Sequence, residues 1–541
     1  MDTMETHGSR FVPPEQFNIA AYFLDDRISE GRGDRIAIRM RDRTWTYADV
    51  QKLANRFGNL LTAAGCEPEQ RVLIALPDGP EYVAALFGTL KIGAVAVMVN
   101  PHLRADQLRS LFAYTRGTIV LTDTETRATF EEAAAGARFI KQVIVTGDYA
   151  FTQRIASASP ELETFPSHRD DPAIWLFSGG TSGQPKAVVQ THRSYANTTE
   201  LYGKGVLRYA EDDITISVPK LFFGYATGSN LFFPFSVGAS TVLFPDRCTP
   251  EVLFDLIETL RPTILINVPT MVAQMTAAEG ASSRDFSSLR VATSAGEALP
   301  VALYERWKAT FGVELLDGLG TAEMWHVFLT NQPGRIRPGT LGTAVPGFEV
   351  KVCDDAGSEL PPGEVGTLWV RGDSRAIAYW QLMDETRKAF RGEWYVSEDM
   401  LSRDEDGFFT YAGRADDMLK VSGKWLAPQD VENCLLQHPA VKECAVVGFA
   451  AGGLTLPYAF VVPATRTNDR TGGTGGTGGT GGTGGTGGTG GDAALAEELQ
   501  AFVKRSLESY KCPRRIIMLD TLPRTHLGKV DRGRLRIEDG A

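Results

Sequence analysis

The chain contains the stretch Leu176-Phe-Ser-Gly-Gly-Thr-Ser-Gly-Gln-Pro-Lys186, which joins apolar segments at residues 173–177 and 187–190. Its glycines would let main-chain N–H groups approach a phosphate closely, its hydroxyls would donate hydrogen bonds, and its lysine would add positive charge. These residues are Ser178, Gly179, Gly180, Thr181, Ser182, Gly183 and Lys186. The order is neither the Walker Gly-Lys-Ser/Thr pattern nor Gly-x-Gly-x-x-Gly. By composition alone, a phosphate-binding loop and a flexible surface hairpin are equally good interpretations.

The order of residues 178–186 resembles the signature loop of the adenylate-forming superfamily, which includes acyl- and aryl-CoA ligases, luciferases and peptide-synthetase adenylation domains. In that superfamily the loop holds the pyrophosphate end of ATP. The resemblance implies a mixed α/β (α+β) fold. A large N-terminal domain of stacked βαβ-type subdomains with a small β-barrel-like part is expected at residues 1–415. A small, mobile C-terminal α+β domain is expected at residues 416–541, with the hinge at Asp416.

The length of 541 residues predicts two or more lobes, and 43% apolar residues with mixed charges are typical of a folded soluble protein. A net charge of −11 disfavours nucleic acid or an anionic membrane as the main partner. The six cysteines are scattered without a Cys-x-x-Cys pair, so neither a zinc site nor a disulfide framework is indicated. No signal peptide and no apolar run of roughly 20 residues is found, and we expect a cytoplasmic protein.

Hydrophobic patterns predict an alternation of strands and helices before the loop. Residues 44–47, 72–76 and 94–99 read as strands, and residues 48–64 and 81–92 read as amphipathic helices between them. A further helix at 105–114 and a strand at 118–121 continue the alternation. Strand, helix and strand at this spacing predict a doubly wound α/β layer.

An aromatic, glycine-containing corner at residues 219–228 follows a predicted strand at 214–218. Taken alone, it indicates hydrophobic core and a turn. The resemblance implies that it lines the acyl pocket, where Phe222, Phe223, Gly224, Tyr225 and Thr227 would form a flat, mostly apolar slot suited to a planar ring. Relatives that activate amino acids carry an aspartate in this region to bind the ammonium group. No aspartate lies between residues 213 and 246, so an amino-acid substrate is disfavoured.

Two later segments resemble the nucleotide-binding elements of the superfamily. Ala295, Gly296 and Glu297 follow a predicted strand and would pack along adenine, although a generic strand-end turn explains them equally well. The second segment contains Asp317, Gly318, Gly320, Thr321 and Glu323 and matches the Gly-Ser/Thr-x-Glu element. There the hydroxyl would meet a nucleotide phosphate, Glu323 would bind Mg²⁺, and Gly320 would border the substrate. One carboxylate suffices because Mg²⁺ keeps phosphate oxygens and water as its other ligands.

Trp325 and His326 continue directly from this element, and in benzoate-type ligases the equivalent neighbours close over the aromatic acid. A buried structural histidine is the alternative interpretation of His326. No proton-transfer role is expected for it, because a carboxylate is already a nucleophile at neutral pH.

The segment 394–399 resembles a Thr-Gly-Asp element, with Ser397-Glu398 in place of the usual Thr-Gly. The resemblance implies that Asp399 accepts hydrogen bonds from the ribose hydroxyls and that Arg414 contacts the nucleotide. The mouth of a thiol tunnel is implied farther along, with candidate coenzyme A contacts at Ser422, Gly423 and Lys424.

The C-terminal part predicts a helix at 428–438, strands at 443–449 and 458–462, and a helix at 493–509. Between them, residues 471–491 are seven Thr-Gly-Gly triplets, which have no apolar side chain and predict a mobile loop. The final motif, at residues 522–530, resembles Pro-x-x-x-x-Gly-Lys of the superfamily, with Lys529 as the catalytic lysine. A lysine there would stabilise the crowded anions as a carboxylate attacks the α-phosphorus of ATP.

The resemblance spans nearly the whole chain and is closest to benzoate-type aryl-CoA ligases. It implies activation of benzoate or a substituted benzoate, such as anthranilate or salicylate, to an acyl-AMP and then to a coenzyme A thioester, with ATP and Mg²⁺. One alternative is an enzyme that loads the phosphopantetheine of a carrier protein. The other is a catalytically silent nucleotide-binding protein. A monomer and a homodimer are both compatible with the sequence.

Overall fold

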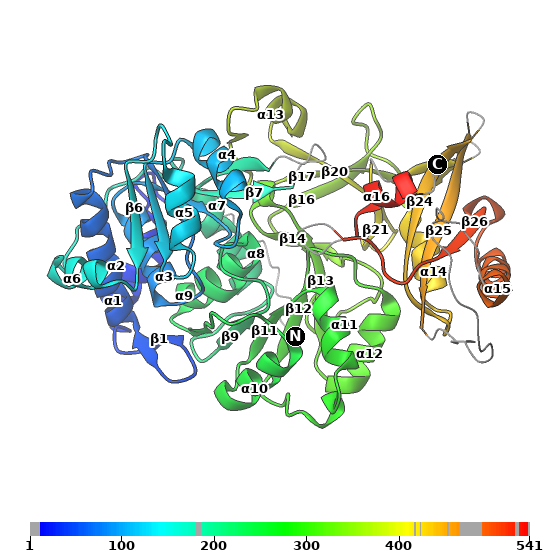
Figure 1. The fold of residues 1–541 in the computed structure, drawn as a ribbon, viewed down its shortest axis with the longest axis horizontal. Helices are drawn as coiled ribbons and strands as arrows, with labels where there is room; N and C mark the ends of the chain where they lie inside the picture. Colours follow the sequence, from blue (N-terminus) through cyan, green and yellow to red (C-terminus); the bar gives the residue numbers. More distant parts are fainter. Residues whose placement is uncertain are drawn as a thin grey trace, which may run out of the picture.

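The computed structural model describes residues 11–179, 185–415, 418–421, 424–451, 454–464, 490–524 and 530–538. Two large α/β units lie side by side, an antiparallel sheet follows them, and a smaller C-terminal α+β unit completes the chain (Figure 1). The predicted mixed α/β class, with a large N-terminal and a small C-terminal part, is confirmed.

The first unit is a seven-stranded sheet with parallel central strands. In spatial order its strands are β18 (Ala378–Tyr379), β8 (Lys186–Thr191), β7 (Pro172–Ser178), β4 (Val95–Met98), β3 (Arg71–Ile74), β5 (Ile119–Asp123) and β6 (Gln142–Thr146). Its helices are α2 (Tyr47–Ala63), α3 (Pro80–Lys91), α4 (Ala105–Thr115), α5 (Arg127–Ala134) and α6 (Tyr149–Ser157). Val72 and Ile74 share a core with α2 and α3, whereas Leu73 between them shares a core with α4 and α5. Helices therefore cover both faces, as the doubly wound prediction required.

Local sequence explains where α2 and α3 begin. Thr46 accepts a hydrogen bond from the backbone of Asp49, and the Asp49 side chain accepts one in return from the backbone of Thr46. This capping box satisfies two N–H groups that a helix start leaves unpaired. Pro80 occupies the first turn of α3, where a missing N–H has no consequence.

The second unit is a nine-stranded sheet with parallel central strands and antiparallel edges. Its order is β15 (Thr343–Ala344), β14 (Val327–Thr330), β13 (Leu315–Gly320), β12 (Val291–Ser294), β11 (Ile264–Asn267), β9 (Ile214–Ser217), β10 (Ser240–Val242), β1 (Ile36–Arg39) and β2 (Thr44–Thr46). One face packs against α10 (Pro250–Leu260), α11 (Pro269–Ala277) and α12 (Val301–Phe311). The other face, through residues such as Ile266 and Leu316, joins the same core as Val72 and Ile74 of the first sheet. The two sheets therefore share one hydrophobic core.

Helical segments contribute buried or partly buried side chains to this shared core. They are η1 (Ala21–Asp25), α1 (Asp26–Ser29), α7 (His192–Thr198), η2 (Thr199–Lys204), α8 (Gly224–Thr227), η3 (Gly228–Phe232) and α9 (Phe233–Val237). The sequence predicted residues 219–228 as a corner and no helix there. The structure instead forms one helical run from Gly224 to Val237, because tertiary burial of its aromatic side chains outweighs the low helix propensity of two glycines.

The third sheet is antiparallel and lies within residues 349–414. Its strands are β16 (Glu349–Cys353), β17 (Val365–Arg371), β19 (Phe390–Arg391), β20 (Trp394–Arg403) and β21 (Phe409–Arg414). Burial alternates residue by residue along β17, so one face packs on the core and the other faces water. Helix α13 (Met383–Ala389) lies between β18 and β19 in the chain.

The C-terminal unit begins with the hairpin β22 (Leu419–Val421) and β23 (Lys424–Leu426). It continues with α14 (Pro428–Leu435), β24 (Val441–Ala451), β25 (Leu454–Pro463), α15 (Gly490–Ser506), β26 (Arg515–Met518) and α16 (Arg532–Glu538). Val446 shares a core with α14 and α15, and its neighbour Val447 shares another with α16. The unit lies beside the third sheet, with α14 against β21 (Figure 1).

Most element boundaries agree with the sequence analysis within a few residues. The helix predicted at 493–509 differs at its C-terminal end: it ends at Ser506, and a short turn at Ser509–Lys511 follows. The predicted mobile loop of Thr-Gly-Gly triplets lies outside the described residues, except for Gly490 and Gly491, which begin α15. No helix in the described part of the chain is both long and apolar enough to span a lipid bilayer.

Candidate active site

Three of the predicted site segments lie at one edge of the second sheet. Parallel strands β9, β11, β12 and β13 end there, at Ser217, Asn267, Ser294 and Gly320. The segments after these strands carry the aromatic corner, the Ala295–Glu297 turn and the Thr321–Glu323 turn. Ligands of open α/β sheets bind at the carboxyl ends of the strands, so the topology itself brings these motifs together.

The predicted phosphate loop joins two paired strands. Ser178, the last residue of β7, lies opposite Lys186, the first residue of β8, in an antiparallel ladder. Gly179 follows Ser178, whereas the predicted loop residues Gly180, Thr181, Ser182 and Gly183 lie outside the described residues. The strands therefore fix both ends of this loop.

The amine of Lys186 points at α13 and β18. Its Nζ lies 3.2 Å from Oε2 of Glu385 and 5.3 Å from the ring centroid of Tyr379. The Glu385 carboxyl has its pKa lowered by hydrogen bonds from Lys388 and Lys186. Lys186 is thus held between a carboxylate and an aromatic face.

Glu323 lies in a short helical turn directly after β13. Its side chain is only 5% exposed. Its Oε1 accepts a 2.8 Å hydrogen bond from the hydroxyl of Tyr379, and its backbone oxygen accepts one from the N–H of Ala376. Burial, followed by the nearby Glu323 carboxylate, raises the pKa of Tyr379 far above its ordinary value, so the phenol stays a donor. The second carboxylate oxygen, Oε2, accepts no hydrogen bond from any described residue.

This geometry fits a divalent cation bound mainly by a nucleotide. Oε2 of Glu323 is left available as one ligand, and Tyr379 fixes the orientation of the carboxylate. Within the described ranges, no group of three or more His, Cys, Asp or Glu side chains could hold a metal ion. Mg²⁺ with few protein ligands and several phosphate and water ligands suits such a site.

Thr321 begins the same turn as its N-cap residue. Its hydroxyl accepts a 3.3 Å hydrogen bond from the N–H of Met324. An accepting hydroxyl keeps its own hydrogen free, so Thr321 can still donate to a phosphate oxygen.

Asp399 and Arg414 lie directly opposite each other on β20 and β21. Ser397 donates a 2.6 Å hydrogen bond to Oδ2 of Asp399, and Tyr411 donates one of 3.4 Å to Oδ1. Arg414 pairs with Glu398. Although burial alone would lower it, the carboxylates of Asp399 and Glu398 raise the pKa of Arg414. The departure from Thr-Gly is thereby explained, because Ser397 orients Asp399 and Glu398 holds Arg414.

In the turn after β12, Gly296 and Glu297 have different structural roles. Gly296 adopts φ = +87°, a left-handed conformation that favours glycine. The carboxylate of Glu297 accepts hydrogen bonds from the N–H and the hydroxyl of Thr270, at the start of α11. The side chain of Glu297 is therefore occupied by that helix, and only its backbone is left for the predicted adenine contact.

Asp317 and Gly318 lie on β13, with Asp317 opposite Ser294 of β12. Burial raises the pKa of Asp317 well above its ordinary range. Hydrogen bonds from Ser294 and from the backbone of Gly318 oppose this effect of burial.

The aromatic corner contains one exposed ring and several buried ones. Phe222 and Phe223 lie with ring centroids 4.4 Å apart, and Phe223 is 43% exposed. The hydroxyl of Tyr225 shares a 2.6 Å hydrogen bond with Thr293 of β12. Thr227 differs from expectation: its buried hydroxyl donates 2.6 Å to the carbonyl oxygen of Leu221. This bond holds the corner together and uses the hydroxyl hydrogen, so only the oxygen lone pairs of Thr227 remain for a substrate substituent.

His326 is enclosed by four aromatic rings, those of Tyr202, Tyr225, Phe233 and Trp325, with centroid distances of 4.8–5.6 Å. Its Nε2 lies 3.1 Å from the carbonyl oxygen of Tyr225 and 3.1 Å from Oγ of Ser229. A carbonyl oxygen only accepts, so Nε2 carries the hydrogen and Nδ1 carries a lone pair. Nδ1 has no partner among the described residues. Burial lowers the pKa of His326 to about 3, so the ring is neutral.

Two glycines make room for His326, Gly228 beside its imidazole and Gly320 beside its backbone. A Cβ on Gly228 would come within 2.3 Å of Cδ2 of His326, and a Cβ on Gly320 would come within 2.5 Å of the His326 carbonyl oxygen. Gly224 is also close-packed, because a Cβ on this residue would lie 3.0 Å from Cδ1 of Leu176. Gly320 and Gly224 were predicted to border the substrate, whereas Gly228 was not singled out.

Two protein-family models match the chain, AMP-binding enzyme over residues 25–380 and AMP-binding enzyme C-terminal domain over residues 430–529. The chain belongs to the AMP-binding enzyme family. The resemblance to adenylate-forming enzymes drawn from the loop and its downstream motifs is therefore confirmed.

Relatives of this AMP-binding enzyme share its full length. The 4-hydroxybenzoate–CoA/benzoate–CoA ligase of Rhodopseudomonas palustris is 36% identical over 97% of this chain and 95% of its own. The crystal structure of the anthranilate CoA ligase AuaEII in complex with anthranoyl-AMP has a TM-score of 0.87 at 34% identity, covering 97% of this chain and 98% of that chain. A benzoate CoA ligase from Burkholderia xenovorans has a TM-score of 0.84 at 36% identity, covering 96% and 100%.

Several predicted residues of the AMP-binding enzyme lie outside the described residues. They are the hinge residue Asp416, the coenzyme A candidates Ser422 and Gly423, and the catalytic candidate Lys529. The backbone of Lys424 begins β23. Arg524 and Val530 form an antiparallel bridge on either side of the Lys529 segment.

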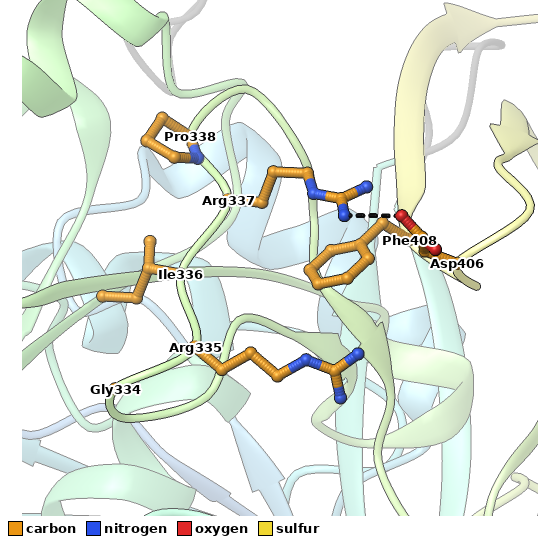
Figure 2. A pocket seen from close by; sticks show the side chains of 7 residues that line it. All are labelled: Gly334, Arg335, Ile336, Arg337, Pro338, Asp406 and Phe408. Carbon is orange, nitrogen blue, oxygen red and sulfur yellow. Dashed lines mark hydrogen bonds and ion pairs between the residues drawn. The ribbon is translucent and has the colours of Figure 1, made fainter.

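A separate surface hollow of about 520 Å³ contains none of the predicted residues (Figure 2). It lies between residues 334–338 and the turn that joins β20 to β21. The guanidinium carbons of Arg335 and Arg337 lie 5.1 Å and 3.8 Å from the ring centroid of Phe408. Arg337 also pairs with Asp404 and Asp406, so its charge is already balanced there.

The sequence analysis of the AMP-binding enzyme missed Tyr379 and Glu385, which contact Glu323 and Lys186. Tyr379 reaches the site because β18 pairs with β8, the strand that Lys186 begins. The partners are 56 and 199 residues apart in the chain, so no local pattern could reveal them.

Proposed function

We propose that the protein is an ATP-dependent aryl-CoA ligase that activates benzoate or a substituted benzoate. The observation that carries the proposal is the neutral His326 inside a box of aromatic rings, on the segment that follows Glu323. A flat, mostly apolar site with one polar group suits an aromatic ring. The relatives named above as benzoate, hydroxybenzoate and anthranilate ligases support the same substrate class.

In the proposed first step, an oxygen of the substrate carboxylate attacks the α-phosphorus of ATP. A new phosphorus–oxygen bond forms, the bond to the β-phosphate bridge breaks, and pyrophosphate leaves. The loop from Ser178 to Lys186 and the hydroxyl of Thr321 would hold the phosphates. Lys529 would stabilise the negative charge that gathers between the carboxylate and the α-phosphate.

The remaining nucleotide contacts are assigned by geometry and charge. Asp399, oriented by Ser397, would accept hydrogen bonds from the two ribose hydroxyls, and Arg414 lies opposite it. The backbone of Ala295 and Gly296 would pack along adenine. When bound, Mg²⁺ would neutralise phosphate charge, with Oε2 of Glu323 as its protein ligand.

In the proposed second step, the coenzyme A thiol attacks the acyl carbon of the adenylate, AMP leaves, and the thioester forms. The mixed anhydride is far more reactive than a free carboxylate because AMP is a good leaving group. The small domain, residues 416–541, would turn about Asp416 between the steps. This turn would move Lys529 away and bring Ser422, Gly423 and Lys424 to the thiol.

The acceptor at Nδ1 of His326 bears on which acid is used. Among the described residues this nitrogen has no hydrogen-bond donor, although it is buried. A ring substituent that donates a hydrogen bond, such as an amino or hydroxyl group, would give Nδ1 a partner and compensate for the hydration that it loses on burial. We therefore rank aminobenzoates and hydroxybenzoates above unsubstituted benzoate.

A variant in Lys529 tests the proposed mechanism. Lys529→Ala should abolish acid-dependent pyrophosphate exchange while sparing thioester formation from supplied aryl-AMP and coenzyme A. Equal loss of both steps would contradict a lysine that acts only in the first. If the wild-type protein exchanges pyrophosphate but transfers the aryl group only to a carrier protein, the acceptor assignment is wrong. Absence of exchange with every acid would favour a silent nucleotide-binding protein.

A further inference from the structure

Asp78 is a buried carboxylate that reaches from the first sheet unit into the second. It lies on the connection between β3 and α3 and is 6% exposed. Its Oδ1 accepts a 2.9 Å hydrogen bond from the N–H of Leu221, 143 residues along the chain. A buried carboxylate is unfavourable unless it is hydrogen-bonded, so the bond from Leu221 matters to Asp78 as well as to the corner.

Leu221 lies in the aromatic corner, directly before Phe222. It is fully buried, and its carbonyl oxygen accepts the hydrogen bond from Thr227 described above. The N–H of Leu221 is held by Asp78 from outside the corner, and its carbonyl oxygen is held by Thr227 from inside. The backbone that carries Phe222, Phe223 and Tyr225 is therefore fixed at Leu221 by a side chain from the first sheet unit.

Lys220 directly precedes Leu221, and its positive charge interacts favourably with the Asp78 carboxylate. Its Nζ donates a 2.7 Å hydrogen bond to the carbonyl oxygen of Phe244 and lies 3.7 Å from the Phe244 ring centroid. The other titratable groups in this environment are Tyr82 of α3 and Cys248, which both face Asp78, and Asp246, which faces Lys220. Lys220 is the cation of this group, so it supplies the charge that balances Asp78.

We propose that Asp78 is a positioning residue for the aromatic-acid pocket, which holds Phe222, Phe223 and Tyr225 in place through the backbone of Leu221. This inference rests on the proposed function, because it assumes that the corner binds the acid. Removing the carboxylate should loosen the corner and weaken acid binding. ATP binding should be unaffected, since Asp78 has no hydrogen bond to any described residue that is assigned to the nucleotide.

The Asp78 carboxylate should also make the affinity of the pocket for the acid depend on pH. Burial raises the pKa of Asp78 to about 6, against the opposing effects of Lys220 and of the Leu221 N–H. Above this pH the carboxylate makes a charge-assisted hydrogen bond, which is stronger than one to a neutral carboxyl group. Below it, protonation weakens the hold on Leu221, so acid affinity should fall as the solution is acidified through this range.

The experiment compares Asp78→Ala and Asp78→Asn with Asp213→Asn. Asp213 is a matched control because it is also buried, also hydrogen-bonded and paired with Arg290, and lies before β9, away from the corner. Two quantities are measured on the full-length protein: deuterium uptake of peptides covering residues 219–227, and KM for the acid and for ATP in pyrophosphate exchange.

Asp78→Ala should raise deuterium uptake at residues 219–227 and raise the acid KM by about tenfold, with the ATP KM changed less than about twofold. Asp78→Asn keeps an acceptor oxygen and should rescue part of the loss. Its acid KM should not change between about pH 7.5 and about pH 5.5, whereas that of the wild type should rise several-fold. Asp213→Asn should leave both KM values and the uptake of 219–227 unchanged.

Unchanged deuterium uptake in Asp78→Ala would overturn the inference, and so would equal increases in the two KM values. If uptake rises as expected but the wild type activates no acid, then Asp78 does position the corner and the proposed function is what fails. The two failures are therefore distinguishable.

Discussion

The hydroxyl of Tyr379 donates a 2.8 Å hydrogen bond to Oε1 of Glu323, and the same phenol ring lies 5.3 Å from the amine of Lys186. Lys186 is in turn paired with Glu385. Four side chains from β18, β8, α13 and the turn after β13 therefore form one connected group. It joins the lysine of the predicted phosphate loop to the carboxylate proposed to bind Mg²⁺.

Tyr379→Phe should weaken the use of Mg²⁺. Without the phenol hydrogen, Oε1 of the buried Glu323 loses its only side-chain donor among the described residues, and the carboxylate is free to turn. A hydrogen bond to a charged group contributes about 1.5–3 kcal/mol, so the Mg²⁺ concentration giving half-maximal pyrophosphate exchange should rise by about tenfold or more.

Tyr47→Phe is the control for this variant, because its buried hydroxyl also donates a hydrogen bond, of 2.6 Å, to the carbonyl oxygen of Ala239. It should lower the free energy of unfolding and leave the Mg²⁺ requirement unchanged. A Tyr379→Phe protein with the Mg²⁺ dependence of the wild type would show that the phenol does not orient Glu323.

Glu385→Gln should lower the KM for ATP by about two- to threefold at low salt. Glu385 is partly exposed, and a surface ion pair of this kind contributes only about 0.2–1 kcal/mol. The phosphates of ATP must break this ion pair before they can bind Lys186. Lys388→Gln removes the other ion pair of Glu385 and should not change this KM. An increase in the ATP KM of Glu385→Gln would mean that Glu385 assists the lysine rather than competes for it.

Gly228→Ala should damage the acid site specifically. The added Cβ would lie 2.3 Å from Cδ2 and 2.6 Å from Nε2 of His326, so the imidazole must move away from its partners Tyr225 and Ser229. We expect the acid KM to rise by about tenfold or more while the ATP KM is unchanged. Gly33→Ala is the control, because its nearest neighbour would be at 3.6 Å, an ordinary contact. Normal acid binding by Gly228→Ala would separate His326 from the substrate.

Acid should destabilise the fold through buried histidines. Burial lowers the pKa of His192 to about 3, from 6.5. Its contribution to stability is complete above pH 6.5 and is lost as the pH falls toward 3, because only the unfolded chain takes up the proton in that interval. The loss is about 1.4 kcal/mol per pH unit for this group.

His192→Asn tests this pH dependence. An asparagine oxygen can replace Nδ1 as the acceptor of the Ile19 N–H, while the titrating group is removed. Urea unfolding between about pH 6 and about pH 4.5 should show a slope that is shallower than that of the wild type by about 1.4 kcal/mol per pH unit. Equal slopes for the two proteins would indicate that His192 is protonated in the folded state.

The regular elements of the fold could be predicted because their patterns are local. Helix α2 has helical periodicity and a capping box, and β3 and β4 are continuous apolar runs. The helical run from Gly224 to Val237 could not be predicted, since it contains two glycines and a proline and is stabilised by burial between the sheets. Its helical state follows from tertiary packing rather than from propensity.

The residues of the candidate site also fall into two groups, those that a local motif predicts and those that only the tertiary structure reveals. Glu323, Asp399 and Arg414 were predicted as site residues from short motifs, and the structure brings Asp399 and Arg414 together across two strands. Thr227 was expected to face the substrate, but its hydroxyl is used by the backbone of the corner. Tyr379 and Asp78 were not identified, because their partners are distant in the chain and only the sheet topology brings them close.

The most direct test of the proposed function is pyrophosphate exchange by the wild-type protein, with formation of the coenzyme A thioester measured in parallel. The panel is benzoate, 2-amino-, 2-hydroxy- and 4-hydroxybenzoate, cinnamate and medium-chain fatty acids. We expect both reactions with the benzoates, and the highest kcat/KM with those that carry an amino or hydroxyl group for Nδ1 of His326. Preference for fatty acids, or no exchange with any aromatic acid, would contradict the assignment of an aryl-CoA ligase.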